Sequence, residues 1–521
     1  MMKKMICGIV VLVMMFAMAA CGGNPAPTDP PDQIKEPGLT LVVGKTMTLE
    51  AAGEQVTWES SDPARATVDE NGTVKALSGR GTVTITAAAA DKTESWDIAL
   101  CEETQFGAVP LASSDEKLTI GVWNGSYHAF DDFRMDLMHQ AGISLIVGID
   151  PQWVVSSTMT ELLDLAQEYG VSLITDLRSW DGQTVPEYAQ HPALMGFLMY
   201  DEPGTPAYAK LAQLKASFDA VMPEDKLFYV NLFGSSCGYE SLYGNDYDPL
   251  HVNYEKDYLK PFIETVEPEV LSYDAYGLQE GGLIRSRYLR NFDILSHNAQ
   301  QNDLPFWYTM LSSAHDATDG RYVVPTDKEL RWQSAMAITY GAEVLLHYIM
   351  TSHETDDYVC MLDYSSKSPT EIYDDVALVN QEFLAWQDIY RSYEWVGTVK
   401  VDVGKENLLL SDFEYDIPFK NAGILTGVKS DQDMLVGVFQ NNGQNAYMIT
   451  NAGDTTDTDL WMRLNFTMND ANVKLQLAPG SYQCAAVINR GQISYVPVNA
   501  DNTVDITVSA YDGAFVIPVA S

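Results

Sequence analysis

Two acidic residues stand side by side at the end of an apolar run in the segment ALMGFLMYDEPG, residues 193–204. Two carboxyls around one small space can divide the work of acid–base catalysis, because burial and repulsion raise the pKa of one while the other stays ionised. Side chains alternate along a strand, so Asp201 and Glu202 can face one site only if the strand ends there, as Pro203 suggests. Glu202 has the longer reach, so we assign it the role of proton donor. We expect Asp201 to orient Glu202 or to bind a substrate hydroxyl.

A repeated pattern places this segment in a larger fold. Short apolar runs alternate with amphipathic segments of helix length, which indicates βα units around a parallel sheet. Eight such units match the size of a (β/α)₈ barrel, with a doubly wound open sheet as the alternative. The predicted strands cover residues 118–123, 143–150, 171–177, 194–202, 227–233, 270–276, 305–311 and 343–350.

Polar and aromatic residues stand where these strands end, which is the rim that carries function in such barrels. Beside Glu202, we expect Asp274 to be the second catalytic carboxyl, because it lies between two tyrosines that could bind sugar. Acids, amides and aromatic rings suit a sugar, whereas a phosphate would need cations and only Arg178 is at hand. The residues that we predict to bind substrate are Trp123, Asp176, Asp201, Asn231, Tyr273, Tyr276, Trp307, Tyr308, His347 and Tyr348.

The motifs GFLMYDEPG, LSYDAYG and AITYGAEVLLHY resemble the clan A glycoside hydrolases, and most nearly barrels related to family 42 β-galactosidases. The resemblance implies that Glu202 ends the fourth barrel strand as the acid/base. The sequence departs from the family pattern at two places. The seventh strand, in LPFWYTMLSSAHD, has no glutamate to serve as nucleophile, and Asp201 stands where the family has asparagine. The second carboxylate is therefore Asp274 or Glu354, or hydrolysis is lost.

The chain begins with a targeting segment. Two lysines precede an apolar run that ends in small residues and Cys21, so residues 1–21 read as a signal peptide. The sequence MAAC resembles the lipobox of bacterial lipoproteins, which implies lipidation of Cys21. We then expect a disordered linker over residues 22–38 and a protein held by lipid on the outer face of the bacterial cell membrane.

Two further parts read as all-β domains. Residues 39–103 show short alternating strands, and VTWESSDPARATVDENGTVKALSGRGTVTIT resembles the bacterial group 2 immunoglobulin-like domain, usually a spacer or an adhesion module. Residues 395–521 return to strand patterns and predict a β-sandwich, as often follows glycosidase barrels. The chain is thus predicted to be multidomain, with the barrel over residues 115–394 between two sandwiches.

Composition limits the partners. The 521 residues carry 31 basic and 72 acidic side chains, a net charge of −41, which would repel nucleic acid and anionic lipid. The histidines and cysteines lack the spacing of a metal site, so we predict no cofactor and no metal. A carbohydrate partner remains, and the oligomeric state stays open. The leading hypothesis is a surface glycoside hydrolase; a non-catalytic glycan-binding lipoprotein and an adhesive surface protein are the alternatives.

Overall fold

The computed structural model describes residues 39–53, 55–89, 92–125, 132–154, 158–245, 247–248, 250–317, 320–352, 358–404, 407–457 and 462–520. The predicted signal peptide, Cys21, the linker and Glu354 lie outside these ranges. The chain divides into two compact units, Met1–Glu116 and Lys117–Ser521. Within the described ranges, every helix is too short or too polar to span a membrane.

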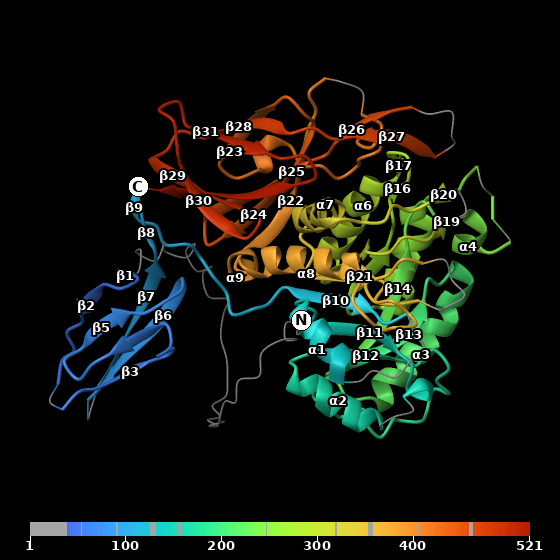
Figure 1. Ribbon diagram of the computed structural model, residues 1–521, viewed down its shortest axis with the longest axis horizontal. Helices are drawn as coiled ribbons and strands as arrows, with labels where there is room; N and C mark the ends of the chain where they lie inside the picture. The colour runs from blue at the N-terminus through green and yellow to red at the C-terminus, as the bar shows by residue number, and fades with distance from the viewer. Residues whose placement is uncertain are drawn as a thin grey trace, which may run out of the picture. The chain divides into compact units, whose positions relative to one another are not determined.

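The first unit is a small β-sandwich. Its strands form sheets in the orders β1-β7-β6-β3 and β2-β5-β4, with a separate hairpin β8-β9 (Figure 1). Alternating residues of β6, such as Val83 and Ile85, are fully buried in the core between the sheets. This arrangement confirms the predicted immunoglobulin-like fold. The strands are β1 (Leu39–Val42), β2 (Thr46–Thr48), β3 (Thr57–Ser60), β4 (Ala66–Val68), β5 (Thr73–Ala76), β6 (Gly81–Ala88), β7 (Thr93–Cys101), β8 (Glu103–Thr104) and β9 (Gly107–Ala108).

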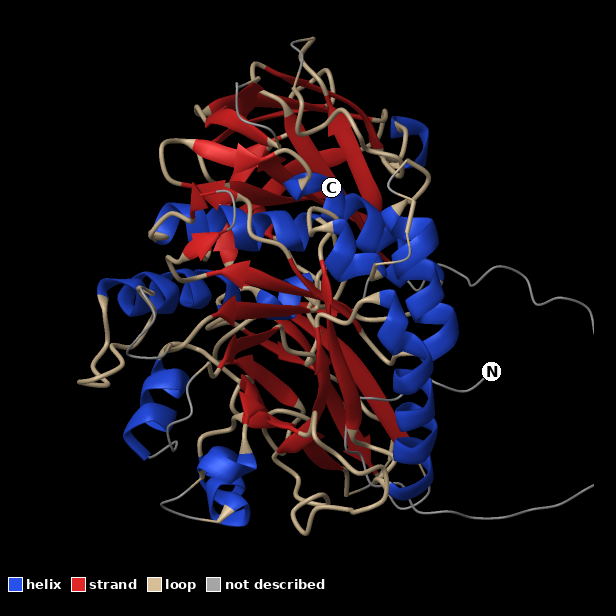
Figure 2. Ribbon diagram, turned by 90° about the vertical axis from the view of Figure 1, so that its right-hand side faces the viewer, coloured by secondary structure: helices blue, strands red, loops and turns tan. Residues whose placement is uncertain are grey.

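The second unit begins with a closed barrel of eight parallel strands, so the predicted barrel is confirmed and the open sheet is not adopted. The first strand pairs with both the second and the last, which closes the ring. Figure 2 shows the strands with helices along their outer side. The strands are β10 (Thr119–Trp123), β11 (Leu145–Ile149), β12 (Ser172–Asp176), β13 (Leu194–Asp201), β14 (Leu227–Phe233), β15 (Leu271–Asp274), β18 (Phe306–Leu311) and β21 (Val344–Tyr348).

Helices follow the barrel strands and have recognisable start signals. Thr158 and Thr326 each cap a helix and form a reciprocal capping box with Glu161 and Glu329. The helices are α1 (Asp132–Gln140), α2 (Met159–Glu168), α3 (Tyr208–Val221), α4 (Tyr239–Tyr243), α5 (Lys260–Val266), α6 (Tyr288–Gln301), α7 (Asp327–Thr339), α8 (Glu371–Leu384) and α9 (Gln387–Tyr390). Short 3₁₀ or π turns are η1 (Pro151–Trp153), η2 (Thr205–Ala207), η3 (Glu255–Leu259) and η4 (Phe419–Asn421).

A C-terminal sandwich completes the unit, as predicted. Its sheets have the orders β22-β24-β25-β32-β29-β30 and β23-β28-β31, and its core is lined by valine, leucine and alanine side chains. The strands are β22 (Glu394–Val401), β23 (Leu425–Ser430), β24 (Met434–Asn441), β25 (Gln444–Asn451), β28 (Ala471–Leu477), β29 (Tyr482–Asn489), β30 (Gln492–Pro497), β31 (Thr503–Val508) and β32 (Gly513–Ala520).

Helix α7 lies between the barrel and this sandwich. All residues from Leu330 to Thr339 are buried, which is unusual for a surface helix and follows from its two packed faces. The Trp332 indole N–H donates to the Asn451 carbonyl at 2.8 Å, and the hydroxyls of Thr339 and Thr450 lie 2.7 Å apart. Figure 1 shows α7 beneath the strands of the sandwich. Helix α7 therefore links the barrel to the sandwich through buried contacts.

The loop after the sixth barrel strand also joins the sandwich. Its two short strands pair with C-terminal strands in a four-stranded sheet of order β16-β17-β27-β26, a connection that the sequence patterns do not predict. Leu283 lies opposite Asn465 in this pairing. The members are β16 (Leu278–Gln279), β17 (Leu283–Arg285), β26 (Asp454–Thr456) and β27 (Arg463–Thr467); a separate hairpin is β19 (Asp316–Ala317) with β20 (Gly320–Arg321). The sandwich thus braces the rim next to β15.

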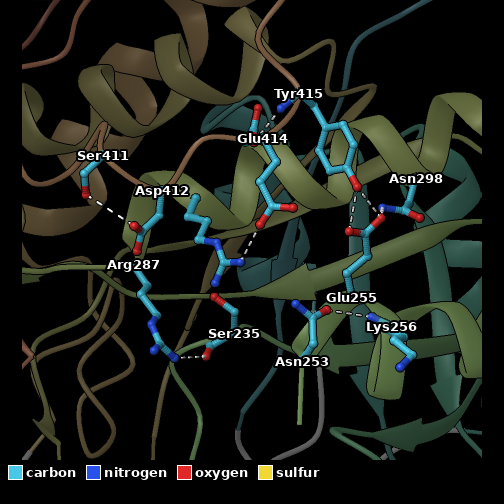
Figure 3. A network of polar contacts seen from close by, with 12 residues as sticks. Ser235, Asn253, Glu255, Lys256, Arg287, Asn298, Ser411, Asp412, Glu414 and Tyr415 are labelled. Atoms are coloured by element: carbon cyan, nitrogen blue, oxygen red, sulfur yellow. Dashed lines mark hydrogen bonds and ion pairs between the residues drawn. The ribbon is translucent and has the colours of Figure 1, made fainter. Parts of the chain in front are cut away.

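A polar network fastens residues 411–416, which we call the strap, to the helices of the barrel (Figure 3). The Tyr415 hydroxyl lies 2.7 and 2.6 Å from the two carboxylate oxygens of Glu255, and Asn298 donates to the same carboxylate at 2.9 Å. Asp293 accepts the backbone N–H of Tyr415 at 3.2 Å. These charge-assisted bonds stabilise a buried carboxylate that would otherwise be costly.

Candidate active site

Three acidic side chains meet at the ends of β13 and β15, the two strands that flank β14. Asp201 is the last residue of β13 and Asp274 the last of β15, and Asn231 lies on β14 between them. The Asn231 side-chain amide donates to Asp274 Oδ1 at 2.9 Å and lies 3.4 Å from Asp201 Oδ1. One amide group therefore holds two carboxyls apart at a fixed spacing.

The backbone turns at Glu202. Its φ is 53°, in the left-handed region that a residue other than glycine adopts only at some cost, and its N–H donates to the Asn231 carbonyl at 2.8 Å. The strand ends at Asp201, so alternation no longer directs the next side chain away. The carboxyls of Glu202 and Asp274 lie close enough for each to perturb the pKa of the other. This turn is what brings adjacent residues of one segment to the same site.

Burial and mutual repulsion perturb all three carboxyls. Burial, with the charges of Asp274 and Asp201, raises the pKa of Glu202 to about 10. Burial and Asp201 raise the pKa of Asp274 to about 7, against the lowering effect of the Asn231 hydrogen bond. Burial also raises the pKa of Asp201, which the nearby Arg178 charge opposes. At neutral pH, a protonated Glu202 can therefore stand beside a carboxyl that is partly ionised.

Asp176 reaches the same rim but is already paired. The Arg178 Nε–H donates to Oδ1 at 3.1 Å and to Oδ2 at 2.9 Å, and a terminal nitrogen donates to Oδ2 at 2.5 Å. Such contacts fix the two side chains against each other. The cation is thus committed to a protein carboxylate, so it does not form an open anion site.

Two groups of aromatic rings lie inside the barrel, and one of them is close to Asp274. Trp123 and Trp307 lie inside the barrel with Tyr229 between them, at ring-centroid distances of 6.2 and 5.4 Å from it. Tyr276 and Tyr348 stack at 5.3 Å. Burial raises the pKa of both; the Asp274 charge raises it further for Tyr276, and Tyr358 and then Asp274 do so for Tyr348. Tyr276 and Tyr348 are therefore close to Asp274, whereas Trp123 and Trp307 contact Tyr229 in the barrel interior. The Trp123 Nε1 donor is buried and has no hydrogen-bond partner among the described residues.

Three other predicted residues face the wrong way, so the prediction that they line the rim is wrong. Tyr273 stacks on Phe306 at 5.8 Å, and the Tyr308 hydroxyl lies 2.8 Å from that of Tyr288 on α6. His347 Nε2 lies 3.0 Å from Asn380 Oδ1 on α8. Each is the immediate neighbour of an inward residue, and alternation along the strand turns it to the helix layer. All three are packing residues between barrel and helices.

A buried relay behind Asn231 was not predicted. The Tyr229 hydroxyl lies 2.9 Å from Ser272 Oγ, which donates to Asn231 Oδ1 at 3.1 Å. This contact fixes which side-chain atom of Asn231 faces the acids, because the oxygen is occupied. Tyr229 and Ser272 each stand two positions before a predicted site residue, so strict alternation was the signal that could have found them.

A thiol lies near the acids, but the described residues contain no cluster that could hold a metal ion. Burial, followed by the Glu202 charge, raises the pKa of Cys237 to about 11, so this thiol stays protonated at neutral pH and is a poor nucleophile. Within the described ranges, no three His, Cys, Asp or Glu side chains are grouped so that they could hold a metal ion. Proton transfer by carboxyls is the chemistry that this arrangement can perform.

Comparison with known proteins bears on both units. Residues 26–97 match the family model described as bacterial Ig-like domain (group 2). No curated protein sequence matches the chain. The match shows that the N-terminal module belongs to this domain family and does not assign a family to the rest of the chain.

Solved structures similar to the chain are glycosidases by their descriptions. A family 42 β-galactosidase from G. stearothermophilus has a TM-score of 0.47 at 8% identity, covering 79% of this chain and 99% of that one. A putative α-galactosidase from Bacteroides fragilis NCTC 9343 has a TM-score of 0.42 at 11% identity, covering 93% and 97%. A β-galactosidase from the psychrophilic Marinomonas ef1 has a TM-score of 0.38 at 11% identity, covering 51% and 60%.

Proposed function

We propose that the barrel is a glycoside hydrolase in which Glu202 donates a proton to the leaving oxygen of a glycosidic bond. The observation that carries this proposal is the grouping of Glu202 with Asp201 and Asp274 at the ends of β13 and β15, where the Asn231 amide contacts both aspartates. A carboxyl that keeps its proton at neutral pH can protonate a leaving group and can later remove a proton from water. Aromatic faces offer surfaces for the apolar side of a sugar ring.

Asp274 supports this step through charge. Its negative charge disfavours ionisation of Glu202, so the proton stays on the residue that must give it away. As that proton leaves, Asp274 can stabilise positive charge that develops at the sugar. Asn231 holds Asp274 in place, and Arg178 limits the repulsion around Asp201.

The proposal is tested by turnover of a panel of 4-nitrophenyl glycosides with the full chain and with Glu202→Gln. We expect the variant to lose about 10²–10⁴-fold in kcat, because it cannot donate the proton, and to keep its affinity for the product sugar. The matched control is Glu267→Gln, since Glu267 has the same φ of 53° but is exposed on a turn before β15. Equal turnover by Glu202→Gln and the full chain would refute the proposal.

A second function is favoured by one observation. Strand β18 ends at Leu311 without a carboxylate, where the resembled family places its nucleophile. A barrel that has lost catalysis would bind glycans through the same acids and rings. Under this alternative, no panel member is turned over, and Glu202→Gln changes the dissociation constant for a glycan measured by calorimetry.

The cell-surface location is likewise a proposal and rests on the sequence MAAC at Cys21. Lipid attachment there would tether the immunoglobulin-like module and the barrel to the outer face of the membrane. Cys21→Ser should abolish incorporation of labelled fatty acid and shift the protein from the membrane fraction. Unchanged labelling would contradict the proposed anchor.

A further inference from the structure

The backbone around Glu202 is fixed by the neighbouring strand and by one tyrosine. The Glu202 N–H donates to the Asn231 carbonyl at 2.8 Å. The following residue, Pro203, has no N–H, so its carbonyl is its only backbone hydrogen-bonding group. The Tyr258 hydroxyl donates to that carbonyl at 2.9 Å and accepts the backbone N–H of Phe233, the last residue of β14, at 3.2 Å. One hydroxyl therefore ties the segment after Glu202 to the end of β14.

This tie holds a conformation that is costly by itself. Glu202 has a φ of 53°, and a residue other than glycine stays in the left-handed region only where surrounding contacts hold it there. Pro203 is buried and Tyr258 is fully buried, so the hydrogen bond between them is shielded from water. Gly204 continues the turn in close contact with α4, since a Cβ there would clash with the Ser241 carbonyl oxygen.

The tyrosine lies on η3, which is a π turn. Such turns are rare and occur frequently at functional sites. Tyr254, directly before the turn, stacks on Tyr258 at 5.2 Å, and its hydroxyl donates to the Phe233 carbonyl at 2.6 Å. The two tyrosines thus bind both backbone polar groups of Phe233. Of the two hydroxyls, that of Tyr258 binds Pro203 as well.

Other contacts hold the backbone of η3 in place. The Tyr208 hydroxyl donates to the Tyr258 carbonyl at 3.2 Å. At the start of the turn, the Glu255 carboxylate is bound by the Tyr415 hydroxyl and lies 3.0 Å from Lys260 Nζ. We therefore expect the turn to keep its fold when a single tyrosine hydroxyl is removed from it.

We propose that Tyr258 is a positioning residue for Glu202, whose backbone it fixes so that the carboxyl stays in place at the end of β13. The inference rests on the proposed hydrolase function and adds to it a residue that acts through Glu202 alone. A proton donor must be aligned with the leaving oxygen, and a displacement of about 1 Å can lower a rate by about 10²-fold.

The tie itself is tested by hydrogen exchange, read by mass spectrometry on the full chain. The test compares Tyr258→Phe with Tyr254→Phe, since both remove one buried hydroxyl and keep the stacked rings. In Tyr258→Phe the Phe233 N–H loses its acceptor and the turn at Glu202 loses its anchor. We expect exchange in peptides containing these two residues to become about 10-fold faster. In Tyr254→Phe both N–H groups keep their partners, so exchange there should change by less than about threefold.

The consequence for catalysis is tested on the 4-nitrophenyl glycosides. We expect Tyr258→Phe to lower kcat about 10-fold with less than about threefold change in KM, and Tyr254→Phe to keep kcat within about threefold. The alkaline limb of the kcat–pH profile should move to lower pH in Tyr258→Phe, because a carboxyl that leaves its buried place ionises more readily. Tyr390→Phe is the remote control. It removes a buried hydroxyl that donates to the Ala342 carbonyl at 2.8 Å, so it should lower the urea midpoint and leave the kinetics unchanged.

The outcomes separate this inference from the proposed function. Unchanged exchange at Glu202 and Phe233 in Tyr258→Phe would overturn the inference. Equal loss of kcat in Tyr258→Phe and Tyr254→Phe, with an unmoved pH profile, would also overturn it, since η3 would then act only as a scaffold. In both cases, turnover that is lost in Glu202→Gln would still support the hydrolase. Absence of turnover by the unmodified chain would refute the proposed function and this inference together.

Discussion

At the scale of single residues, the site concentrates three carboxyls where burial opposes their charge. Their pKa values are raised, so the folded chain binds protons that the unfolded chain has already released. The free energy of unfolding therefore decreases as pH rises between the unfolded and folded pKa values. For Glu202 this window runs from 4.5 to about 10, and for Asp274 from 3.8 to about 7. The acids are thus expected to serve chemistry at the expense of stability.

Removing one acid should stabilise the barrel at alkaline pH. We expect Glu202→Gln and Asp274→Asn each to raise the free energy of unfolding by on the order of 1–3 kcal/mol at pH 8, and by little at pH 4, where the wild-type carboxyls are protonated. Thermal unfolding followed by circular dichroism across pH 4–9 would measure this. A variant that is less stable than the wild type at pH 8 would contradict the view that burial of these charged carboxyls destabilises the folded chain.

At the scale of elements, side chains alternate along the barrel strands between the candidate site inside the barrel and the helix layer outside it. Tyr229 faces inward and supports Asn231 through Ser272, whereas Tyr308 faces α6 and bonds to Tyr288. Both tyrosines are fully buried on strands of the same barrel. Their hydroxyls therefore provide a matched pair for telling positioning from packing.

Loss of the inward hydroxyl should affect rate, and loss of the outward one should affect stability alone. Tyr229→Phe frees Ser272 and Asn231, so we expect kcat to fall about 10-fold with a smaller change in KM. Tyr308→Phe should lower the free energy of unfolding by about 1–2 kcal/mol and leave kcat and KM unchanged. Steady-state kinetics and urea denaturation on the same preparations would measure the two effects. Equal kinetic effects of the two substitutions would mean that the relay does not position Asn231.

At the scale of the whole molecule, the C-terminal sandwich packs against the barrel and supports its rim. It covers α7, pairs with the loop after β15 and holds the strap against α6 and η3. Glu255 is only 6% exposed and depends on donors from both parts of the unit. The sandwich therefore determines how the rim beside Asp274 is supported.

The strap should contribute to the stability of the fold without affecting catalysis. Tyr415→Phe removes a hydroxyl donor from the buried Glu255 carboxylate, so we expect a loss of about 1–3 kcal/mol in the free energy of unfolding and no change in kcat. His297, whose ring stacks on Tyr415 at 3.7 Å, keeps that contact in the variant. An unchanged urea midpoint would contradict this expectation. It would show that Lys260, 3.0 Å from Glu255, and Asn298 stabilise the buried Glu255 carboxylate without the Tyr415 hydroxyl.

The sequence by itself determined the domain types, the order of the barrel strands and the candidate acids, because hydrophobic periodicity and strand-end positions are local properties. Tertiary structure decided the rest. Only the left-handed turn at Glu202 and the pairing of β13, β14 and β15 bring Glu202 against Asp274. Tyr273, Tyr308 and His347 were placed at the rim by sequence, but strand register turned them outward. Which face a strand residue takes depends on pairing between distant segments, and that information lies in the closed barrel.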